Sequence, residues 1–383
     1  MANSYLSNAK NAKNDEFYTQ YGDIEKEVNA YLEFDPDVFR GKTVLLPCDD
    51  PEWSNFTRYF AQNFERLGLA KLISTSYAPT AAAHQMTPTT LESDSPLFDP
   101  HKTTVNGKIF TLTRDVSADD RINIDDLEWQ YLDGDGDFRS DEVSRLRDEA
   151  DVIITNPPFS MFREFLAWIV QAEKKFVIIG SMNAITYLEV FRLIKNDRIW
   201  LGNGFRSGNA FFRPLTEREY SSGVFDAETK LVKFRNVVWF TNLDHGRRHS
   251  PLPLMTMADN VRFSRHREIR GRAGYEAYDN YDAIEVPFTD AIPGDYAGAM
   301  GVPISFLDKY SPDQFEILGM PENTDPDGLK TKVYSTAECQ RAYVNKFGKP
   351  GTYDLNARGV VLRNGLMEKV YSRILIRHRR PVG

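Results

Sequence analysis

Short apolar runs alternate with amphipathic stretches over the first two thirds of the chain. Residues 54–69 (SNFTRYFAQNFERLGL) place aromatic and aliphatic side chains three or four positions apart, which predicts a helix with one buried face. Ser54 is suited to begin this helix and Gly68 to end it. Further helices are expected at 159–174 and 186–196. β-Branched or continuously apolar runs predict strands at 42–47, 70–77, 107–113, 151–159, 175–181 and 198–202.

Apolar strands that alternate with helices predict an α/β fold with a doubly wound, mostly parallel sheet. The stretch 230–243 (KLVKFRNVVWFTNL) favours a β-hairpin that closes this sheet. Beyond about His245 the alternation ends, and Pro, Gly and Tyr become frequent. We therefore expect a catalytic or ligand-binding domain at 1–244 and an irregular, basic region at 245–383.

Composition narrows the class of protein. A chain of 383 residues usually needs more than one hydrophobic core. No run approaches the roughly 18 apolar residues of a membrane span, and the N-terminus shows no apolar leader. The two cysteines, Cys48 and Cys339, are far apart and the six histidines are scattered, so neither a disulfide framework nor a metal site is expected. These features predict a cytoplasmic protein without a membrane partner.

The net charge of −8 hides an uneven distribution of basic residues. The stretch 262–272 (RFSRHREIRGR) has five arginines and one glutamate, and the last twelve residues have four arginines and no acid. Such clustering is typical of a basic face that binds nucleic acid. A solvated surface with local salt bridges is the other interpretation.

The strand expected at 151–159 ends in Asn156-Pro157-Pro158-Phe159. An asparagine side chain and a proline carbonyl can both accept hydrogen bonds from one exocyclic amine. The prolines stiffen the turn, so these acceptors are preorganised, and an aromatic ring beside them can stack on a planar base. The pattern suits methylation of an amino group on a heteroaromatic ring. An ordinary strand end followed by a core phenylalanine remains the alternative.

Other strand ends carry acidic residues. Asp49 and Asp50 follow the first strand, where either carboxylate could bind a cationic amino-acid group or cap the next helix. In "DGDGDF", Asp137 could accept a bond from an adenine amino group and Phe138 could stack on the ring. A calcium loop is disfavoured, because an EF-hand that starts at Asp133 would need Gly at position 138. Residues 17–19 (FYT) precede a helix and suit either packing or a lid over a cofactor.

Taken in order, these segments resemble one family. "DEFYTQY", "CDDPEWSNFTRYFAQNFERLGL", "GDGDFRS", "TNPPFS" and "KKFVIIGSMNAITY" are similar to the EcoRI-type adenine-specific (N6) DNA methyltransferases, and the likeness extends to "YSRILIRHRR". The resemblance implies S-adenosylmethionine as methyl donor, no metal, and N6 of a flipped-out adenine in duplex DNA as acceptor. Residues 1–244 would then be the catalytic domain and 245–383 the target-recognition region.

The resemblance also implies roles for individual residues. Asn156, Pro157, Pro158 and Phe159 match the catalytic motif, with N6 bound by Asn156 and the Pro157 carbonyl. The strand after residue 70 ends in Ser76–Tyr77 rather than in the acidic residue that commonly holds the cofactor ribose, so Tyr77 is assigned that place by position alone. The residues expected to bind the cofactor are Phe17, Tyr18, Thr19, Pro47, Cys48, Asp49, Asp50, Tyr77, Asp137, Phe138 and Asn156. Those expected to bind DNA are Arg247, Arg248, Arg262, Arg265, Arg267, Arg270 and Arg272.

Two other functions fit parts of the sequence. Asn-Pro-Pro followed by an aromatic residue also suits a methyltransferase that acts on glutamine amides in protein. A non-catalytic DNA-binding protein on a methyltransferase fold is the second alternative. A chain with its own recognition region can work as a monomer, and the family resemblance suggests a restriction–modification system with a cognate endonuclease that acts on the same site.

Overall fold

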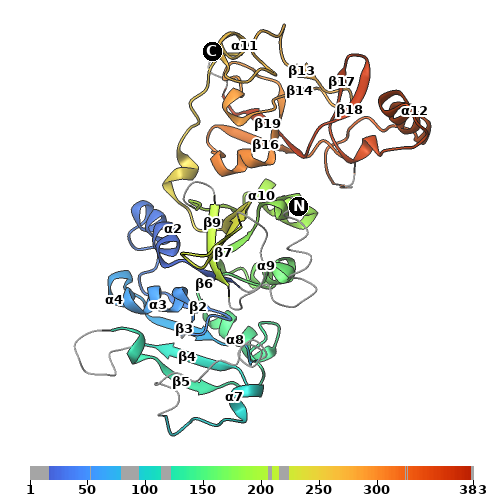
Figure 1. Cartoon of the computed structure of the whole chain (residues 1–383). Coiled ribbons are helices and arrows are strands. Elements are labelled where there is room, and N and C mark those ends of the chain that lie inside the picture. The colour runs from blue at the N-terminus through green and yellow to red at the C-terminus, as the bar shows by residue number, and fades with distance from the viewer. Residues whose placement is uncertain are drawn as a thin grey trace. The chain divides into compact units, whose positions relative to one another are not determined.

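The structure of the protein is a computed structural model. It describes residues 17–51, 53–78, 95–113, 122–205, 209–214, 224–323, 325 and 327–380. The chain divides into two compact units (Figure 1). The first contains Met1–Ala184 and Ile199–Gly246, and the second contains Ile185–Arg198 and Arg247–Gly383.

An eight-stranded sheet forms the centre of the first unit, with strand order β5-β4-β3-β2-β6-β7-β12-β8. Its strands are β2 (Thr43–Leu46), β3 (Lys71–Thr75), β4 (Lys108–Leu112), β5 (Glu128–Tyr131), β6 (Val152–Thr155), β7 (Lys175–Ser181), β8 (Trp200–Leu201) and β12 (Val237–Thr241). The neighbours β3, β2, β6 and β7 pair in parallel. The outer strands pair antiparallel. The fold is thus α/β with a mixed sheet, and the mostly parallel sheet expected from the sequence is confined to the four central strands.

The outermost pair on one side of the sheet is β4 and β5. Parallel neighbours need a long crossover, usually a helix. Between β4 and β5 the only element that the structure describes is the 3₁₀ turn η1 (Ile124–Asp126). β4 and β5 pair antiparallel, which the apolar pattern of the sequence did not reveal.

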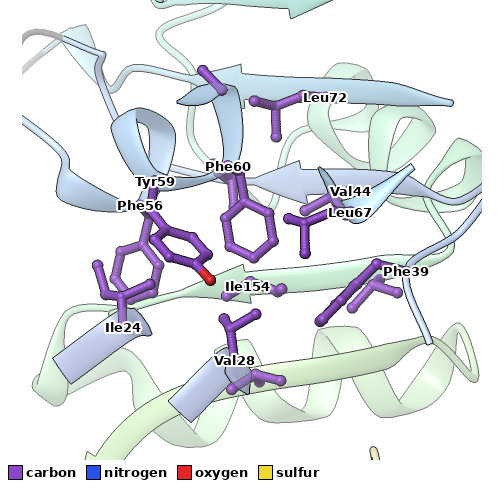
Figure 2. Close-up of a cluster of buried hydrophobic side chains, with 14 of the residues drawn as sticks. Ile24, Val28, Phe39, Val44, Phe56, Tyr59, Phe60, Leu67, Leu72 and Ile154 are labelled. Carbon is purple, nitrogen blue, oxygen red and sulfur yellow. The ribbon is translucent and has the colours of Figure 1, made fainter. Parts of the chain in front are cut away.

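The helices of the first unit are α2 (Tyr21–Phe34), α3 (Asn55–Gln62), α4 (Phe64–Leu67), α7 (Lys102–Val105), α8 (Asp141–Glu149) and α9 (Phe162–Gln171). Ser54 caps α3 by accepting from the N–H groups of Phe56 and Thr57, and Gly68 ends α4 in a left-handed conformation, φ +64°. The apolar face predicted from the sequence is buried between α2 and the sheet. Figure 2 shows this core, which includes Ile24, Val28, Phe39, Val44, Phe56, Tyr59, Phe60, Leu67, Leu72 and Ile154.

A small sheet of order β1-β9-β11-β10 completes the first unit. Its strands are β1 (Phe17–Thr19), β9 (Asn209–Pro214), β10 (Phe225–Asp226) and β11 (Leu231–Arg235). The hairpin predicted at 230–243 is wrong, because β11 pairs with β9 and β12 pairs with β7. Between them Asn236 has φ +60°, and at this turn the chain passes from one sheet to the other.

The second unit is more regular than the sequence suggested. It contains a five-stranded sheet of order β13-β14-β15-β19-β16 and a hairpin, β17-β18. Its strands are β13 (Glu276–Ala277), β14 (Ala283–Glu285), β15 (Ala299–Pro303), β16 (Phe315–Gly319), β17 (Val360–Arg363), β18 (Leu366–Lys369) and β19 (Arg373–His378). Its helices are α10 (Leu188–Lys195), α11 (Met257–Phe263) and α12 (Thr336–Phe347). The arginine-rich end of the chain is partly an interior strand, since β19 pairs on both sides and fully buries Ile374, Leu375 and Ile376.

Neither a membrane-spanning helix nor a cluster of metal-binding side chains is found among the described residues. None of their helices has both the length and the apolar character needed to cross a membrane. Within the same residues, no three His, Cys, Asp or Glu side chains gather as a metal site would require.

Candidate active site at the strand ends

The carboxyl ends of β2, β3 and β6 meet at one edge of the large sheet. β2 lies between the other two strands, with which it pairs in parallel. Side chains tie the ends together, since Thr155 Oγ1 donates to the Pro47 carbonyl at 3.0 Å and the Cys48 N–H donates to Thr75 Oγ1 at 3.1 Å. The residues that follow each strand are thereby held as neighbours, as expected for an open α/β sheet.

Asp49 is held firmly at the first of these strand ends. Its side chain is buried, and Oδ1 accepts a hydrogen bond of 2.7 Å from Ser54 Oγ. Its carbonyl accepts from Thr57 Oγ1 at 2.8 Å and from Ser74 Oγ. The preceding Cys48 has φ +63°, which turns the chain sharply at the end of the strand. This network fixes a buried acidic side chain at the sheet edge.

Asp50 lies beside Asp49 but has a different position. It is half-buried, and its carbonyl accepts from the N–H groups of Trp53 and Ser54 at the start of α3. Pro47 is buried beneath the turn.

A small pocket opens beside Asp49. It is lined by Tyr18, Thr19, Cys48, Asp49, Ser54, Asn55, Phe56, Asn156 and Pro158. The pocket unites three segments that the sequence analysis had singled out separately. Its volume of about 30 Å³ has room for only a few atoms. A cavity of about 330 Å³ elsewhere, lined by residues of α10 and 319–328, contains none of the predicted site residues.

β1 forms one wall of this pocket. Asn55 Nδ2 donates to the Thr19 carbonyl at 2.7 Å and so holds β1 against the start of α3. Thr19 is buried, and its Oγ1 has no hydrogen-bond partner among the residues that the structure describes. A buried hydroxyl without a partner is costly unless a ligand or water supplies one. The side chain of Phe17, also predicted here, lies outside the described part of the chain.

Sequence reasoning missed Asn55 and Phe56 as pocket residues. Ser54 was identified only as a helix cap. The position of these residues directly after the first strand-end turn is the signal that could have found them.

Tyr77 and Asp137 lie together near Cys48. Burial raises the pKa of Tyr77, and the negative charges of Asp135 and Asp137 raise it further. Hydrogen bonds from Arg139 lower the pKa of Asp137, since Nε donates to Oδ1 at 2.9 Å and Nη2 to Oδ2 at 2.6 Å. Gly136 brings the two segments close, because a Cβ at this position (φ +86°) would collide with the carbonyl oxygen of Ser76. Asp137 is therefore a carboxylate that already has a cationic partner.

Phe138 lies in the interior of the first unit. Its side chain is only 4% exposed and packs edge-on against Phe165 and Trp168, with ring centroids 4.9 and 5.6 Å away. The turn thus directs Phe138 inward onto α9. Its stacking on a cofactor adenine stays a prediction.

Asn156 and the residues after it connect β6 to α9. Asn156 and Pro158 line the pocket, Pro157 is buried, and Phe159 begins the 3₁₀ turn η2 (Phe159–Met161). The half-buried Phe159 ring packs against Phe212 and Phe234 of the small sheet, at centroid distances of 6.5 and 6.2 Å. The motif is thus a turn with its asparagine in the pocket and its aromatic ring packed against β9 and β11 of the small sheet.

The seven arginines predicted to bind DNA fall into two groups. Arg247 forms an ion pair with Asp308 at 2.6 Å, and Arg248, only 7% exposed, pairs with Asp197. Buried in this way, Arg248 is not available to a phosphate. The remaining arginines, which are all exposed, are Arg262, Arg265, Arg267, Arg270 and Arg272. Of these, only Arg265 has an ion-pair partner among the described residues, Asp290 at 2.7 Å.

The chain matches a known protein family. Residues 5–379 match the family described as adenine-specific methyltransferase EcoRI. The chain belongs to this family. It is 40% identical over 330 residues to the Type II methyltransferase M.EcoRI of Escherichia coli, an alignment that covers 85% of this chain and 92% of that protein.

Two further relatives have similar coverage. The chain is 32% identical to M.MpnI of Mycoplasma pneumoniae over 336 residues, which is 86% of this chain and 90% of the relative. It is also 32% identical to M.MgeORF184P of Mycoplasma genitalium, over 86% of this chain and 91% of the relative. Both are named Type II methyltransferases. No solved structure matches the chain.

Proposed function

We propose that the protein transfers the methyl group of S-adenosylmethionine to N6 of an adenine flipped out of duplex DNA, within a restriction–modification system. The observation that carries this proposal is the meeting of Asn156 and Asp49 in one pocket at the strand ends. Membership of a family of adenine-specific methyltransferases and the Type II names of the relatives support it.

Asn156 and Pro157 are the groups that meet the target amine. The amide oxygen of Asn156 and the carbonyl of Pro157 accept hydrogen bonds from the two N–H groups of N6, which directs the nitrogen lone pair away from the ring. Pro157 and Pro158 keep these acceptors in place, so little reorganisation accompanies the reaction. Phe159, half-buried against β9 and β11, is the ring on which the flipped adenine would stack.

The residues of the pocket fit the amino-acid end of the cofactor. This end carries an ammonium and a carboxylate, and the pocket presents the buried Asp49 side chain and the buried Thr19 hydroxyl. The pocket is too small for the nucleoside, which would extend along the strand ends towards Tyr77 and Asp137. When bound, S-adenosylmethionine supplies a methyl group already activated by its sulfonium, so no side-chain nucleophile is needed.

The two parts of the chain would divide the work. Residues 1–244 would hold the cofactor and the flipped base, and residues 245–383 would bind the target duplex. The exposed arginines of 262–272 are the best placed for phosphate contacts, which should make binding depend strongly on salt. We propose a cytoplasmic monomer that acts with a cognate endonuclease.

Expression in a host that lacks adenine methylation tests the reaction and names the site. Genomic DNA would be sequenced by a method that reads modified bases, and one motif carrying N6-methyladenine is expected. Methylation of protein glutamine by the purified enzyme, with unmodified DNA, would favour the protein-methylating alternative. Duplex binding without any calorimetric affinity for S-adenosylmethionine would favour the non-catalytic one.

A further inference from the structure

The segment 256–272 in the second unit is held in a defined conformation. Thr256 caps α11 by accepting from the Asp259 N–H at 3.1 Å, and Asn260 is fully buried. The Gly271 N–H donates to the Val261 carbonyl at 2.9 Å, so the segment folds back on its own helix. Ile269 is only 3% exposed, so it anchors the part of the segment that folds back towards α11.

A large apolar side chain projects from this fixed segment. Phe263, the last residue of α11, is 60% exposed. Its ring contacts the Arg262 guanidinium, which lies 4.9 Å from the ring centroid, and makes no ring–ring contact with any described residue. One exposed phenylalanine is ordinary on a protein surface. Its surroundings make this one unusual.

Of the five arginines in 262–272, only Arg265 has an ion-pair partner among the described residues, Asp290. Arg363, Arg373 and Arg377 each form an ion pair with a glutamate, at 2.7 to 2.9 Å. Within the described residues, none is found for Arg262, Arg267, Arg270 or Arg272. Five arginines with one glutamate in eleven residues leave an excess of positive charge in the segment that carries Phe263, on a chain whose net charge is −8.

We propose that Phe263 is an apolar wedge that inserts between bases of duplex DNA, while the arginines of 262–272 bind the flanking phosphates. This inference rests on the proposed function and adds to it a residue with no predicted role. Arginine forks match phosphate oxygens, and apolar side chains at the centre of such contacts are known to unstack and bend a duplex. The hydrogen bonds within 256–272 and the buried Asn260 and Ile269 hold the backbone that carries Phe263 in a folded conformation.

The test uses the full-length protein and a fluorescent duplex that contains the motif methylated by the wild type. Dissociation constants would be measured over a range of salt concentrations, together with methylation rates. Phe263→Ala should weaken duplex binding about tenfold, because a wedge contributes as a stacked base does. The slope of log Kd against log salt should not change, because no phosphate contact is lost.

Two variants serve as controls. Phe34→Ala removes a ring that also ends a helix and is 46% exposed, but that neighbours Glu33 and Asp35; it should bind DNA as the wild type does. Phe263→Leu keeps an apolar wedge and should retain binding within about threefold of the wild type. Thermal melting of each variant would show that the fold is intact.

The outcomes separate this inference from the proposed function. A wild-type protein that methylates DNA while Phe263→Ala binds the duplex within about twofold of it would overturn the wedge alone. A salt slope lowered by Phe263→Ala would also overturn it, since the ring would then be acting through the phosphate contacts. A wild-type protein that methylates no DNA would refute the proposed function itself.

Discussion

The strand-end pocket of the first unit and the arginine segment of the second hold their polar groups in opposite ways. In the pocket, Asp49 is buried and Thr19 is almost fully enclosed, and backbone or side-chain bonds position their neighbours. In the segment 256–272 the backbone is fixed, but the arginine side chains extend into solvent. Methyl transfer needs a few groups in fixed positions, whereas phosphate binding needs many charges without competing partners. Changes in the two regions should therefore affect different measurements.

Loss of the Asn156 amide should have the largest effect. Asn156→Ala removes one of the two acceptors for N6, and methyl transfer should fall at least about a hundredfold. Affinity for S-adenosylmethionine, measured by calorimetry, should remain close to that of the wild type. Asn156→Asp keeps an acceptor oxygen and should retain more activity than the alanine variant. Unchanged turnover in Asn156→Ala would remove the basis for the proposed mechanism.

Loss of the Asp49 charge should come next. Asp49→Asn keeps the shape and can still accept from Ser54, but it cannot pair with an ammonium group. Affinity for S-adenosylmethionine should fall about tenfold, the usual size of a charged hydrogen bond. Duplex affinity and its salt slope should stay the same. Equal cofactor affinity in the two proteins would exclude Asp49 from the binding site.

Two arginines allow a direct comparison within the second unit. Arg267→Gln removes an exposed charge and should lower the slope of log Kd against log salt by about one phosphate contact. Arg248→Gln removes a buried guanidinium that pairs with the exposed Asp197. It should leave that slope unchanged, while lowering the melting temperature by about 2–4 °C. If Arg248→Gln alone changed the slope of log Kd against log salt, the buried Arg248 would be shown to reach DNA.

The smallest effect concerns Asp137. Hydrogen bonds from Arg139 hold its pKa below the ordinary value, so the stability this pair provides is present above the unfolded pKa of about 4. It is lost as the pH falls through the lower folded value. Arg139→Gln should raise the pKa of Asp137, which NMR titration would measure. As the pH is lowered, acid unfolding of this variant should begin at a higher pH than that of the wild type. An unchanged pKa would show that Arg139 is not its cause.

Several local features could be predicted from the sequence because their causes are local. The helical face at 54–69, the cap at Ser54 and the stop at Gly68 follow from spacing and from residue type. The structure confirms all three, although it divides the single predicted helix at Asn63 into α3 and α4. The proximity of the carboxyl ends of β2, β3 and β6 could also be predicted from the sequence, since parallel strands place their carboxyl ends at one edge of a sheet. These features depend on neighbours within a few residues or on the direction of a strand.

Other features depend on partners distant in the sequence. The burial of Phe138 is decided by α9, and the inward position of Arg248 by Asp197, which lies 51 residues away. β11 and β12 are adjacent in the sequence but belong to different sheets, because β11 pairs with β9 and β12 pairs with β7. The periodicity of the sequence does not encode these contacts, because each depends on the relative free energies of alternative long-range contacts.

By itself, the sequence determined the chemistry: the Asn156 motif, the acidic strand ends and the excess of arginine in 262–272 are properties of residue type and order. Only the tertiary structure decided which of these side chains are accessible to solvent or a ligand. It buried Phe138 and Arg248, enclosed Thr19 beside Asp49, and left Phe263 in solvent. The physical reason is that a side chain is buried or exposed according to what packs against it, and in a mixed sheet those neighbours come from remote segments of the chain.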